Sequence, residues 1–414
     1  MRPALAPFRS QPFRLLFGGR LADNVANAIT PIALAFAVLD LGGSPTVLGL
    51  VLAARTLPMV LFVLFGGVLA DRLPRHLVLV AANAVSAGTQ ALVAVLLLTD
   101  VAELWQLAAI EAVNGMSSAF MMPASSGLTP STVAGDQLQP ANALLRLGHN
   151  FSFVTGSAAG GALVAVSGSG WAFAVDAVLF AVAAVLLARI RLPYTARVQS
   201  TVLADLREGW SEFRSRTWLW VVVASFAFVN AAWSGATNAL GPVVADESIG
   251  RAAWGLVLAS LTAGMFVGGL FALRSRWERP LFAGMCAVLL QVPVLLVLGL
   301  QPRTVPLMLC ALVAGFGLET FTVAWDVSMQ SNIPADRLSR VYAYDWFGSL
   351  VFIPVGLAVA GPLADHVGVD ATIVGAALLI TLVTTVALAV PGVRHLRRVD
   401  PEPDVSRSTR APVV

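Results

Sequence analysis

The sequence predicts an all-α integral membrane protein with about twelve transmembrane helices in two pseudo-symmetric six-helix bundles. Three observations predict this fold class: an apolar composition, long apolar runs bounded by charged residues, Gly or Pro, and a repeat that relates two halves of the chain. Of the 414 residues, 57% are hydrophobic and 12% are charged, whereas soluble proteins carry roughly 25% charged residues. With a mean hydropathy of +0.81, most of this surface belongs in lipid.

The apolar runs are long enough to cross a bilayer as helices, which need about 20 residues each. A transmembrane β-barrel would instead show short segments of alternating hydrophobicity. The expected spans cover residues 14–39, 46–70, 77–99, 103–127, 143–166, 170–189, 217–242, 252–273, 281–300, 304–328, 342–364 and 370–391.

The basic residues orient these spans. All 26 Lys+Arg positions are Arg, and only Arg251 and Arg303 fall in loops on the side opposite the N-terminus. The positive-inside rule therefore predicts that both termini are cytoplasmic. The Arg residues are not interleaved with aromatic residues as in a nucleic-acid-binding surface, so the lipid bilayer is the expected partner and nucleic acid is not.

The longest polar stretch divides the chain into two halves. The predicted organisation is a six-helix bundle over 1–190, a cytoplasmic linker with an amphipathic helix over 191–216, a second bundle over 217–393 and a disordered tail over 394–414. The halves also repeat at a constant offset of 200 residues. Gly115, Asp136, Leu138, Gly148, Gly156, Gly161 and Gly168 recur as Gly315, Asp336, Leu338, Gly348, Gly356, Gly361 and Gly368. Parallel repeats of this kind are an architecture of secondary transporters.

Two motifs give the chain a family resemblance. The loop after the second span contains Gly67, Leu69, Asp71, Arg72 and Arg75, and the fifth span contains Gly156-Ser157-Ala158-Ala159-Gly160-Gly161. With these residues the chain resembles the major facilitator superfamily, and most of all its twelve-span drug:proton antiporter branch, which includes enterobactin-type and macrolide-type exporters. It departs from the family pattern at Pro74, where Gly is usual, and at Ser157, where Pro is usual.

The resemblance implies a monomeric transporter of a bacterial inner membrane. The expected activity is efflux of amphipathic small molecules (drugs, antibiotics or siderophore-like compounds) by alternating access, with protons as the second partner and the proton gradient, not a cofactor, as energy source. A uniporter or importer of a specific metabolite is the alternative, and a receptor with a transporter fold is a further one. An enzyme is not expected, because the sequence shows no metal cluster, no nucleophile beside a His and no phosphate-binding loop.

Charged residues inside spans are costly and mark candidate functional sites. Glu319, Glu111 and Asp23 are the candidates for proton coupling, with Glu319 first because no basic partner is expected at its depth; a structural role is the alternative for each. Arg55 and Glu111 lie at matching depths, which predicts a buried pair. Arg20 and Asp23, three residues apart, are expected to pair on one helix face.

The resemblance also assigns residues to the substrate cavity and to a cytoplasmic latch that breaks when the halves rock. The cavity candidates are Asn27, Arg55, Asn114, Met121, Met122, Asn230, Trp233 and Asn238. The latch candidates are Gly67, Asp71, Arg72, Arg75, Asp136, Arg340 and Asp345. In the alternative interpretation, Arg72 and Arg75 only set the topology. The antiporter-like motif consists of Gly156, Ser157, Gly160 and Gly161, whose small side chains would let neighbouring helices approach closely.

Overall fold

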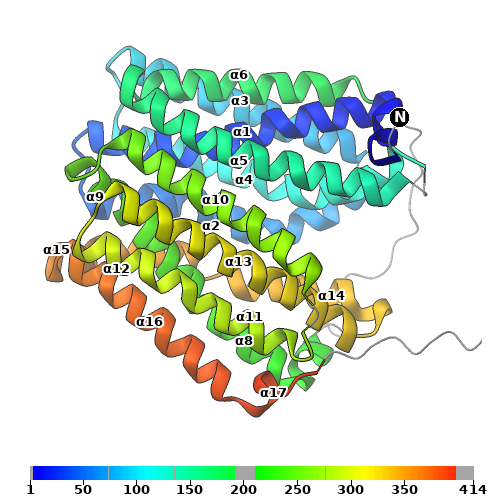
Figure 1. Cartoon of the computed structure of the whole chain (residues 1–414). Helices are drawn as coiled ribbons and strands as arrows, with labels where there is room; N and C mark the ends of the chain where they lie inside the picture. The colour runs from blue at the N-terminus through cyan, green and yellow to red at the C-terminus, as the bar shows by residue number, and fades with distance from the viewer. Residues whose placement is uncertain (1–2, 73, 135–136, 192–209, 276, 398–414) are drawn as a thin grey trace, which may run out of the picture.

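The computed structural model describes residues 3–72, 74–134, 137–191, 210–275 and 277–397, and these ranges are helical without any strand (Figure 1). Within them, the side chains of residues 3–4, 63–72, 122–127, 130, 139, 273, 335–340 and 343 are not described. The N-terminal half contains η1 (Pro3–Arg9), α1 (Gln11–Asp40), α2 (Pro45–Arg72), α3 (Arg75–Leu98), α4 (Leu104–Leu128), η2 (Thr129–Ser131), α5 (Leu138–Ser167) and α6 (Ser169–Ala188).

The C-terminal half has more interruptions. It contains α8 (Thr217–Ser234), η4 (Gly235–Leu240), α9 (Gly241–Glu247), α10 (Arg251–Arg274), α11 (Pro280–Val288), η5 (Leu289–Gln291), α12 (Val292–Leu300), α13 (Thr304–Asn332), α14 (Ala335–Leu350), α15 (Ile353–Val367), α16 (Val369–Ala389) and α17 (Pro391–Arg394). Both ends of the described chain lie at one end of the bundle, which we call the tail end; the opposite end is the far end (Figure 1).

The predicted spans are confirmed. Within the described ranges, ten helical units are long and apolar enough to cross a membrane. The two remaining ones, α4 and α5, are 25 and 30 residues long and also reach across a bilayer. One boundary differs in a way that matters for the site: α5 begins at Leu138 and not near residue 143.

Three spans of the C-terminal half are interrupted just before a proline. Pro242, Pro293 and Pro354 occupy the first turn of α9, α12 and α15, respectively. Proline has no amide hydrogen to donate to the preceding turn, so the regular α-helical ladder breaks there. Before Pro242 the break takes the form of a π-helix, η4, a conformation that is frequent at functional sites.

The repeat seen in the sequence has a structural counterpart in helix packing. Gly115 of α4 lies directly against the backbone carbonyl of Arg55 in α2, and Gly315 of α13 lies in the same way against the carbonyl of Leu261 in α10. Only glycine permits such an approach at these positions, because a Cβ atom would overlap the carbonyl group. The two halves are therefore built on the same helix-pair geometry.

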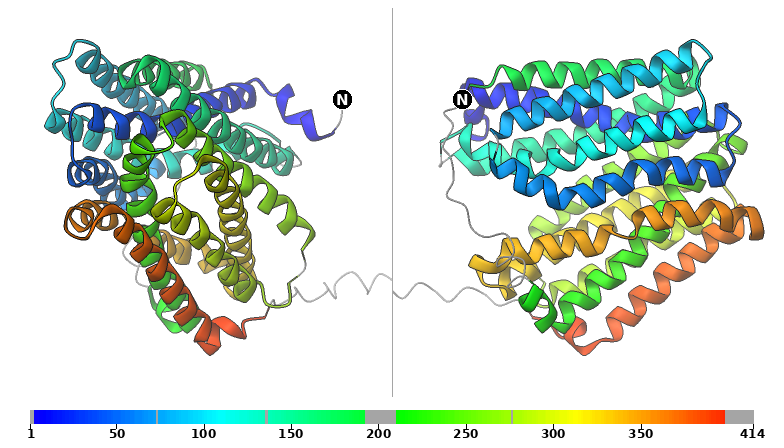
Figure 2. Two further views of the ribbon diagram at one scale, coloured as in Figure 1. Left: turned by 60° about the vertical axis from the view of Figure 1, so that its left-hand side comes forward. Right: turned by 180° about the vertical axis from the view of Figure 1, so that it is seen from behind.

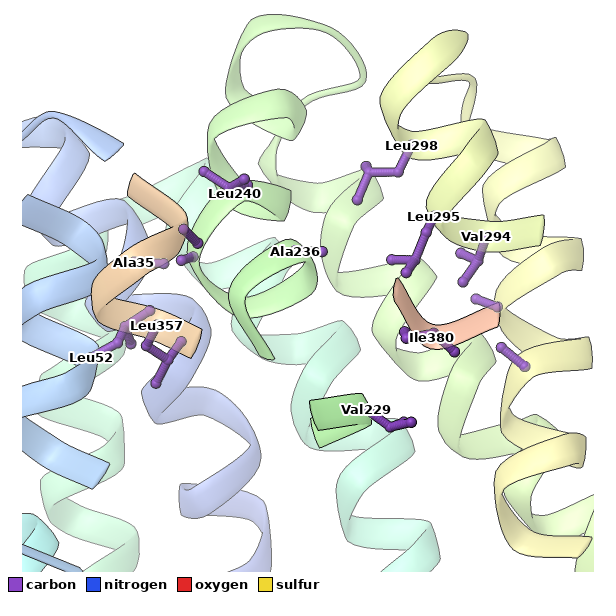
Figure 3. Close-up of a cluster of buried hydrophobic side chains, with 14 of the residues drawn as sticks. Ala35, Leu52, Val229, Ala236, Leu240, Val294, Leu295, Leu298, Leu357 and Ile380 are labelled. Carbon is purple, nitrogen blue, oxygen red and sulfur yellow. The ribbon is translucent and has the colours of Figure 1, made fainter. Parts of the chain in front are cut away.

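A continuous apolar core crosses from one half to the other. Figure 3 shows Leu52 of α2 next to Leu357 of α15, and both side chains are buried. Figure 2 shows the helices of the two halves side by side at the far end of the molecule. The halves therefore meet through apolar packing there, and this packing positions the polar groups described below.

The predicted linker helix falls mostly outside the described residues, which resume at Trp210. Trp210 and Phe213 stack with ring centroids 5.7 Å apart and both contact Tyr344 of α14. The start of the second half is thus held against the tail end of the C-terminal bundle. The tail over 398–414 lies outside the described residues, and the domain boundaries remain a prediction.

Candidate functional site

An ion pair between Arg146 and Glu319 joins the two halves. Arg146 of α5 places Nη2 3.2 Å from Oε1 of Glu319 in α13, and Glu319 is buried. The expectation that Glu319 has no basic partner is therefore wrong. The reason is the early start of α5: Arg146 lies more than two turns inside this helix, where its long side chain can reach a carboxylate of the neighbouring half.

A second ion pair lies wholly inside the N-terminal half. Arg55 Nη1 lies 2.9 Å from Glu111 Oε2, and the side chain of Glu111 has no exposed area. The pair predicted from matching depths is confirmed. The close approach of Gly115 to the backbone of Arg55 holds α2 and α4 together beside this pair.

The third carboxylate, Asp23, is buried in α1. Asn27 Nδ2 donates to Asp23 Oδ1 at 3.1 Å, and Arg20 Nη1 lies 4.0 Å from Asp23 Oδ2. The pairing of Arg20 with Asp23 is as the three-residue spacing predicted. Asn27, predicted to line the cavity, thus also supports this carboxylate.

The other cavity candidates do not meet at one place. Asn114 is buried and donates to Thr89 Oγ1 of α3 at 3.1 Å, and Met121 is buried in the same bundle. Asn230 of α8 donates to the backbone carbonyl of Ser349 at 2.9 Å. Trp233 is half-buried and Asn238 is exposed in η4, while the side chain of Met122 lies outside the described residues. Their assignment to a substrate cavity remains a prediction.

The latch also remains a prediction. The side chains of Gly67, Asp71, Arg72, Asp136 and Arg340 lie outside the described residues, and Arg75 begins α3 with contacts of its own. Asp345 is buried, and it accepts hydrogen bonds from Trp325 Nε1 at 2.9 Å and Ser349 Oγ at 3.3 Å. Asp345 is therefore held by its own half, and its part in a latch remains a prediction.

The antiporter-like motif in α5 packs against two neighbours. Gly156 lies against Val25 and Ala28 of α1, inside the N-terminal half. Gly161 faces the other half, where a Cβ atom would lie 2.8 Å from the Cα atom of Gly255 in α10. The predicted close approach of helices is confirmed at both positions; Gly160 contacts Ile29 in the same manner, and Ser157 is buried.

A matching contact on the other side of the interface escaped the sequence reading. Gly49 at the start of α2 lies against the backbone of Leu357, and Gly361 lies against the backbone of Thr46. Gly49 and Gly255 each begin a Gly-Leu-Val-Leu-Ala segment, which occurs at 49–53 and again at 255–259, and Gly161 and Gly361 are 200 residues apart. The far end is therefore closed by two equivalent pairs of glycines, one pair on each side.

Polar contacts reinforce this closure. Arg251 at the start of α10 lies 2.6 Å from Asp40 at the end of α1, and also 2.7 Å from Asp246 of its own half. Thr46 donates a hydrogen bond to Asp365 across the same end. These residues lie in or near loops, and the sequence alone did not indicate that they meet.

A groove of about 520 Å³, open at the surface, lies in the C-terminal half between α8, η4, α15 and α16. Its walls are almost entirely apolar, and they include Phe228, Phe352, Leu363 and Ala376. Among the described residues, no group of three His, Cys, Asp or Glu side chains is placed to hold a metal ion.

A family model described as transmembrane secretion effector matches residues 2–411. The chain belongs to this family. It is a multi-pass membrane transporter of the major facilitator superfamily, a superfamily of transporters and not of enzymes. The predicted family resemblance is thereby confirmed.

Curated relatives match this transporter over nearly their whole length. The multidrug efflux pump Tap of Mycolicibacterium fortuitum is 28% identical over 403 residues, which cover 93% of this chain and 97% of that protein. Macrolide efflux protein A of Streptococcus pyogenes is 22% identical over 400 residues, covering 94% and 97%.

Solved structures share the fold. The nucleoside transporter NupG superposes with a TM-score of 0.71 at 15% identity, covering 94% of this chain and 99% of that one. A bacterial homologue of the human lysosomal transporter Spinster, in an inward-facing and unoccupied conformation, gives a TM-score of 0.72 at 15% identity, covering 96% and 99%. At these identities the likeness shows the major facilitator fold alone.

Proposed function

We propose that this transporter exports amphipathic small molecules in exchange for protons, by alternating access between its two halves. The names of the relatives, a multidrug efflux pump and a macrolide efflux protein, support export of such substrates. The proton gradient would be the energy source, and no cofactor is needed for such an exchange.

The ion pair between Arg146 and Glu319 is the single observation that carries proton coupling. Its two members belong to different halves, so a movement of one half against the other must lengthen or break it. A buried carboxylate that loses its cation is most easily stabilised by taking up a proton. Protonation of Glu319 and separation of the halves would therefore favour each other, which is the linkage that an exchanger needs.

The far-end contacts support alternating access. If the tail end is cytoplasmic, as the placement of Arg predicts, the glycine pairs close the outer side and this conformation would receive substrate from the cytoplasm. The latch candidates at the other end, Asp71, Arg72 and Arg75 among them, would close the cytoplasmic side in the alternate state. Substrate would bind between the halves near Asn27 and Trp233.

The test is transport by purified protein in proteoliposomes under an imposed pH gradient, with a fluorescent cationic dye or a macrolide as substrate. Wild-type export is expected to depend on the gradient. Glu319→Gln, which cannot exchange a proton, is expected to lose gradient-driven export by at least about tenfold, about 1.4 kcal/mol in barrier height. Glu247→Gln is the matched control, because Glu247 is exposed at the far end.

The alternatives appear as distinct outcomes of the same assay. Transport that ignores the pH gradient in the wild type would replace the exchanger with a uniporter. Movement of the substrate toward the cytoplasmic side would make the protein an importer. Equal loss in Glu319→Gln and Glu247→Gln would mean that Glu319 has no specific part in coupling.

A further inference from the structure

Asp176 provides a fully buried carboxyl inside the N-terminal half. It lies in α6, about 10 Å from the helix start at 1.5 Å per residue, and its exposed area is zero. Asp176 Oδ2 lies 2.6 Å from Thr30 Oγ1 of α1, whereas Asp176 Oδ1 is buried and has no hydrogen-bond partner among the residues described. Glu111 Oε1 is also buried without a hydrogen-bond partner, but Arg55 compensates the charge of Glu111, whereas no cation contacts Asp176 among the residues described.

The charges around Asp176 do not balance if it is ionised. Residue counting places Arg55 and Glu111, ten and seven residues from the far-end starts of α2 and α4, near the depth of Asp176, and Asp23 lies about two turns from Thr30 in α1. Arg55 is already bonded to Glu111, and Asp23 has Arg20 nearby. Three carboxyls thus share two guanidinium groups. One buried negative charge would be left without a cation, which is strongly unfavourable in a low-dielectric interior.

The other helices packed against α6 bring no further cation to this depth. The acidic and basic residues of α3 are Arg75 and His76, at its tail-end start. Those of α5 are Arg146, which pairs with Glu319, and His149. Both positions on α5 lie at least about 25 Å along the helix from its far end, whereas Asp176 lies near the far end of α6.

The hydroxyl of Thr30 agrees with a neutral Asp176. Thr30 Oγ1 lies 3.0 Å from the backbone carbonyl of Ala26 and 2.6 Å from the Asp176 carboxyl, and both neighbours are acceptors if Asp176 is ionised. One hydroxyl proton serves one acceptor well. If Asp176 is protonated, it donates to Thr30 and Thr30 donates to Ala26, so each contact has one proton.

We propose that Asp176 and Glu111 form a two-carboxyl proton site, in which Asp176 holds the proton and Glu111 holds the guanidinium of Arg55. The proton and the guanidinium can exchange places between the two carboxyls. When Arg55 moves from Glu111 to Asp176, the O–H bond of Asp176 breaks and the proton passes to Glu111, with no change in net charge. From Glu111, or directly from Asp176, the proton leaves to water when the bundle opens. This site is separate from the pair of Glu319 with Arg146.

The spectroscopic test is infrared difference spectroscopy of the full chain in nanodiscs at neutral pH. The wild type is expected to show the carbonyl stretch of a protonated, buried carboxyl. This band is expected to disappear in Asp176→Asn, whose amide can still donate to Thr30 and which therefore keeps the packing. It is expected to persist in Asp370→Asn, the control, because Asp370 is exposed at the start of α16.

Two further variants test the sharing of one guanidinium by the two carboxyls. Glu111→Gln frees Arg55 for Asp176, so the band is expected to disappear although Asp176 is still present. Arg55→Gln leaves both carboxyls without a cation, so the band is expected to grow. A band that disappears in Glu111→Gln and grows in Arg55→Gln would not arise if Arg55 and Glu111 had only a structural role. An unchanged band in Asp176→Asn, or the same sign in both variants, overturns the site.

The role of this proton in transport rests on the proposed function, and the experiments separate the two. If wild-type transport does not depend on a pH gradient, the proposed function is wrong, but the infrared band still shows whether Asp176 holds a proton. If the wild type is gradient-driven, Asp176→Asn is expected to reduce gradient-driven transport by at least about tenfold. If Asp176→Asn moves as many protons per substrate molecule as the wild type, Asp176 has no part in coupling.

Discussion

The two halves share their packing but differ in the chemistry of their interiors. The contact of Gly115 with the backbone of Arg55 in the N-terminal half corresponds to the contact of Gly315 with the backbone of Leu261 in the C-terminal half. Gly168 and Gly368, with φ of 85° and 94°, make the same turn before α6 and α16. The backbone framework is thus preserved where helices touch at their closest.

The side chains around this framework have diverged. At the 200-residue offset, the buried Glu111 and Asp176 correspond to Ala311 and Ala376. The N-terminal half therefore encloses an ion pair and a lone carboxyl, whereas Ala311 is part of the apolar core and Ala376 lines the apolar groove. Close glycine contacts therefore set the helix arrangement, and the positions between them can hold either charged or small apolar side chains.

The largest effect is expected when the N-terminal half is given the residues of the C-terminal half. Arg55→Leu alone is expected to destabilise the protein by about 3–5 kcal/mol, because it leaves the carboxyl of Glu111 buried without its cation. Glu111→Ala alone is expected to cost less, because Arg55 can then pair with Asp176. The double variant is expected to regain most of this loss, since a buried pair replaced by apolar residues is often nearly neutral. Thermal unfolding in detergent measures all three.

The reverse substitution provides the control for this cycle. Leu261→Arg places a single charge at the corresponding position of the C-terminal half, where Ala311 offers no partner. Leu261→Arg is expected to be as destabilising as Arg55→Leu. If the double variant is no more stable than either single variant, the side chains of the two interiors are not interchangeable, and the halves share only their backbone arrangement.

A smaller effect is expected from adding one methyl group at the paired glycines. Gly115→Ala and Gly315→Ala are each expected to cost about 1–3 kcal/mol, because the new Cβ atom must displace a backbone carbonyl of the facing helix. The two losses are expected to be similar. Gly375→Ala, whose Cβ atom would meet nothing within 4 Å, is the control. Unequal losses at Gly115 and Gly315 would show that the halves do not share their packing.

Much of this fold follows from the sequence because membrane helices impose a simple geometry. Span number follows from the lengths of apolar runs, and depth follows from counting residues along a helix. Depth counting was sufficient for Arg55 and Glu111, because α2 and α4 are neighbouring helices of one half that run in the same direction. The offset of 200 residues likewise located Gly115 and Gly315 before their contacts were known.

The contacts between the halves were less accessible to sequence reasoning. The partner of Glu319 was missed because the start of α5 was placed too late, which put Arg146 at the very start of the span instead of two turns inside it. The pairs Asp40 with Arg251 and Gly161 with Gly255 join segments whose relative position depends on how the bundles dock. No hydrophobic period encodes that docking, so these contacts required the structure.

The smallest expected effect concerns the far end, where polar and glycine contacts close the same interface. Arg251 has a side chain that is 24% exposed, and Asp40 one that is 36% exposed, so solvent screens their attraction. Arg251→Gln is therefore expected to weaken closure by at most about 1 kcal/mol, an effect that shrinks as salt is added. Reactivity of a single engineered thiol in place of Leu357, which is buried where α15 meets Gly49 of α2, in a background without Cys286 and Cys310, measures closure. An increase in reactivity of more than about tenfold (1.4 kcal/mol) that persists in high salt would mean that Arg251, rather than the glycine pairs, holds the far end shut.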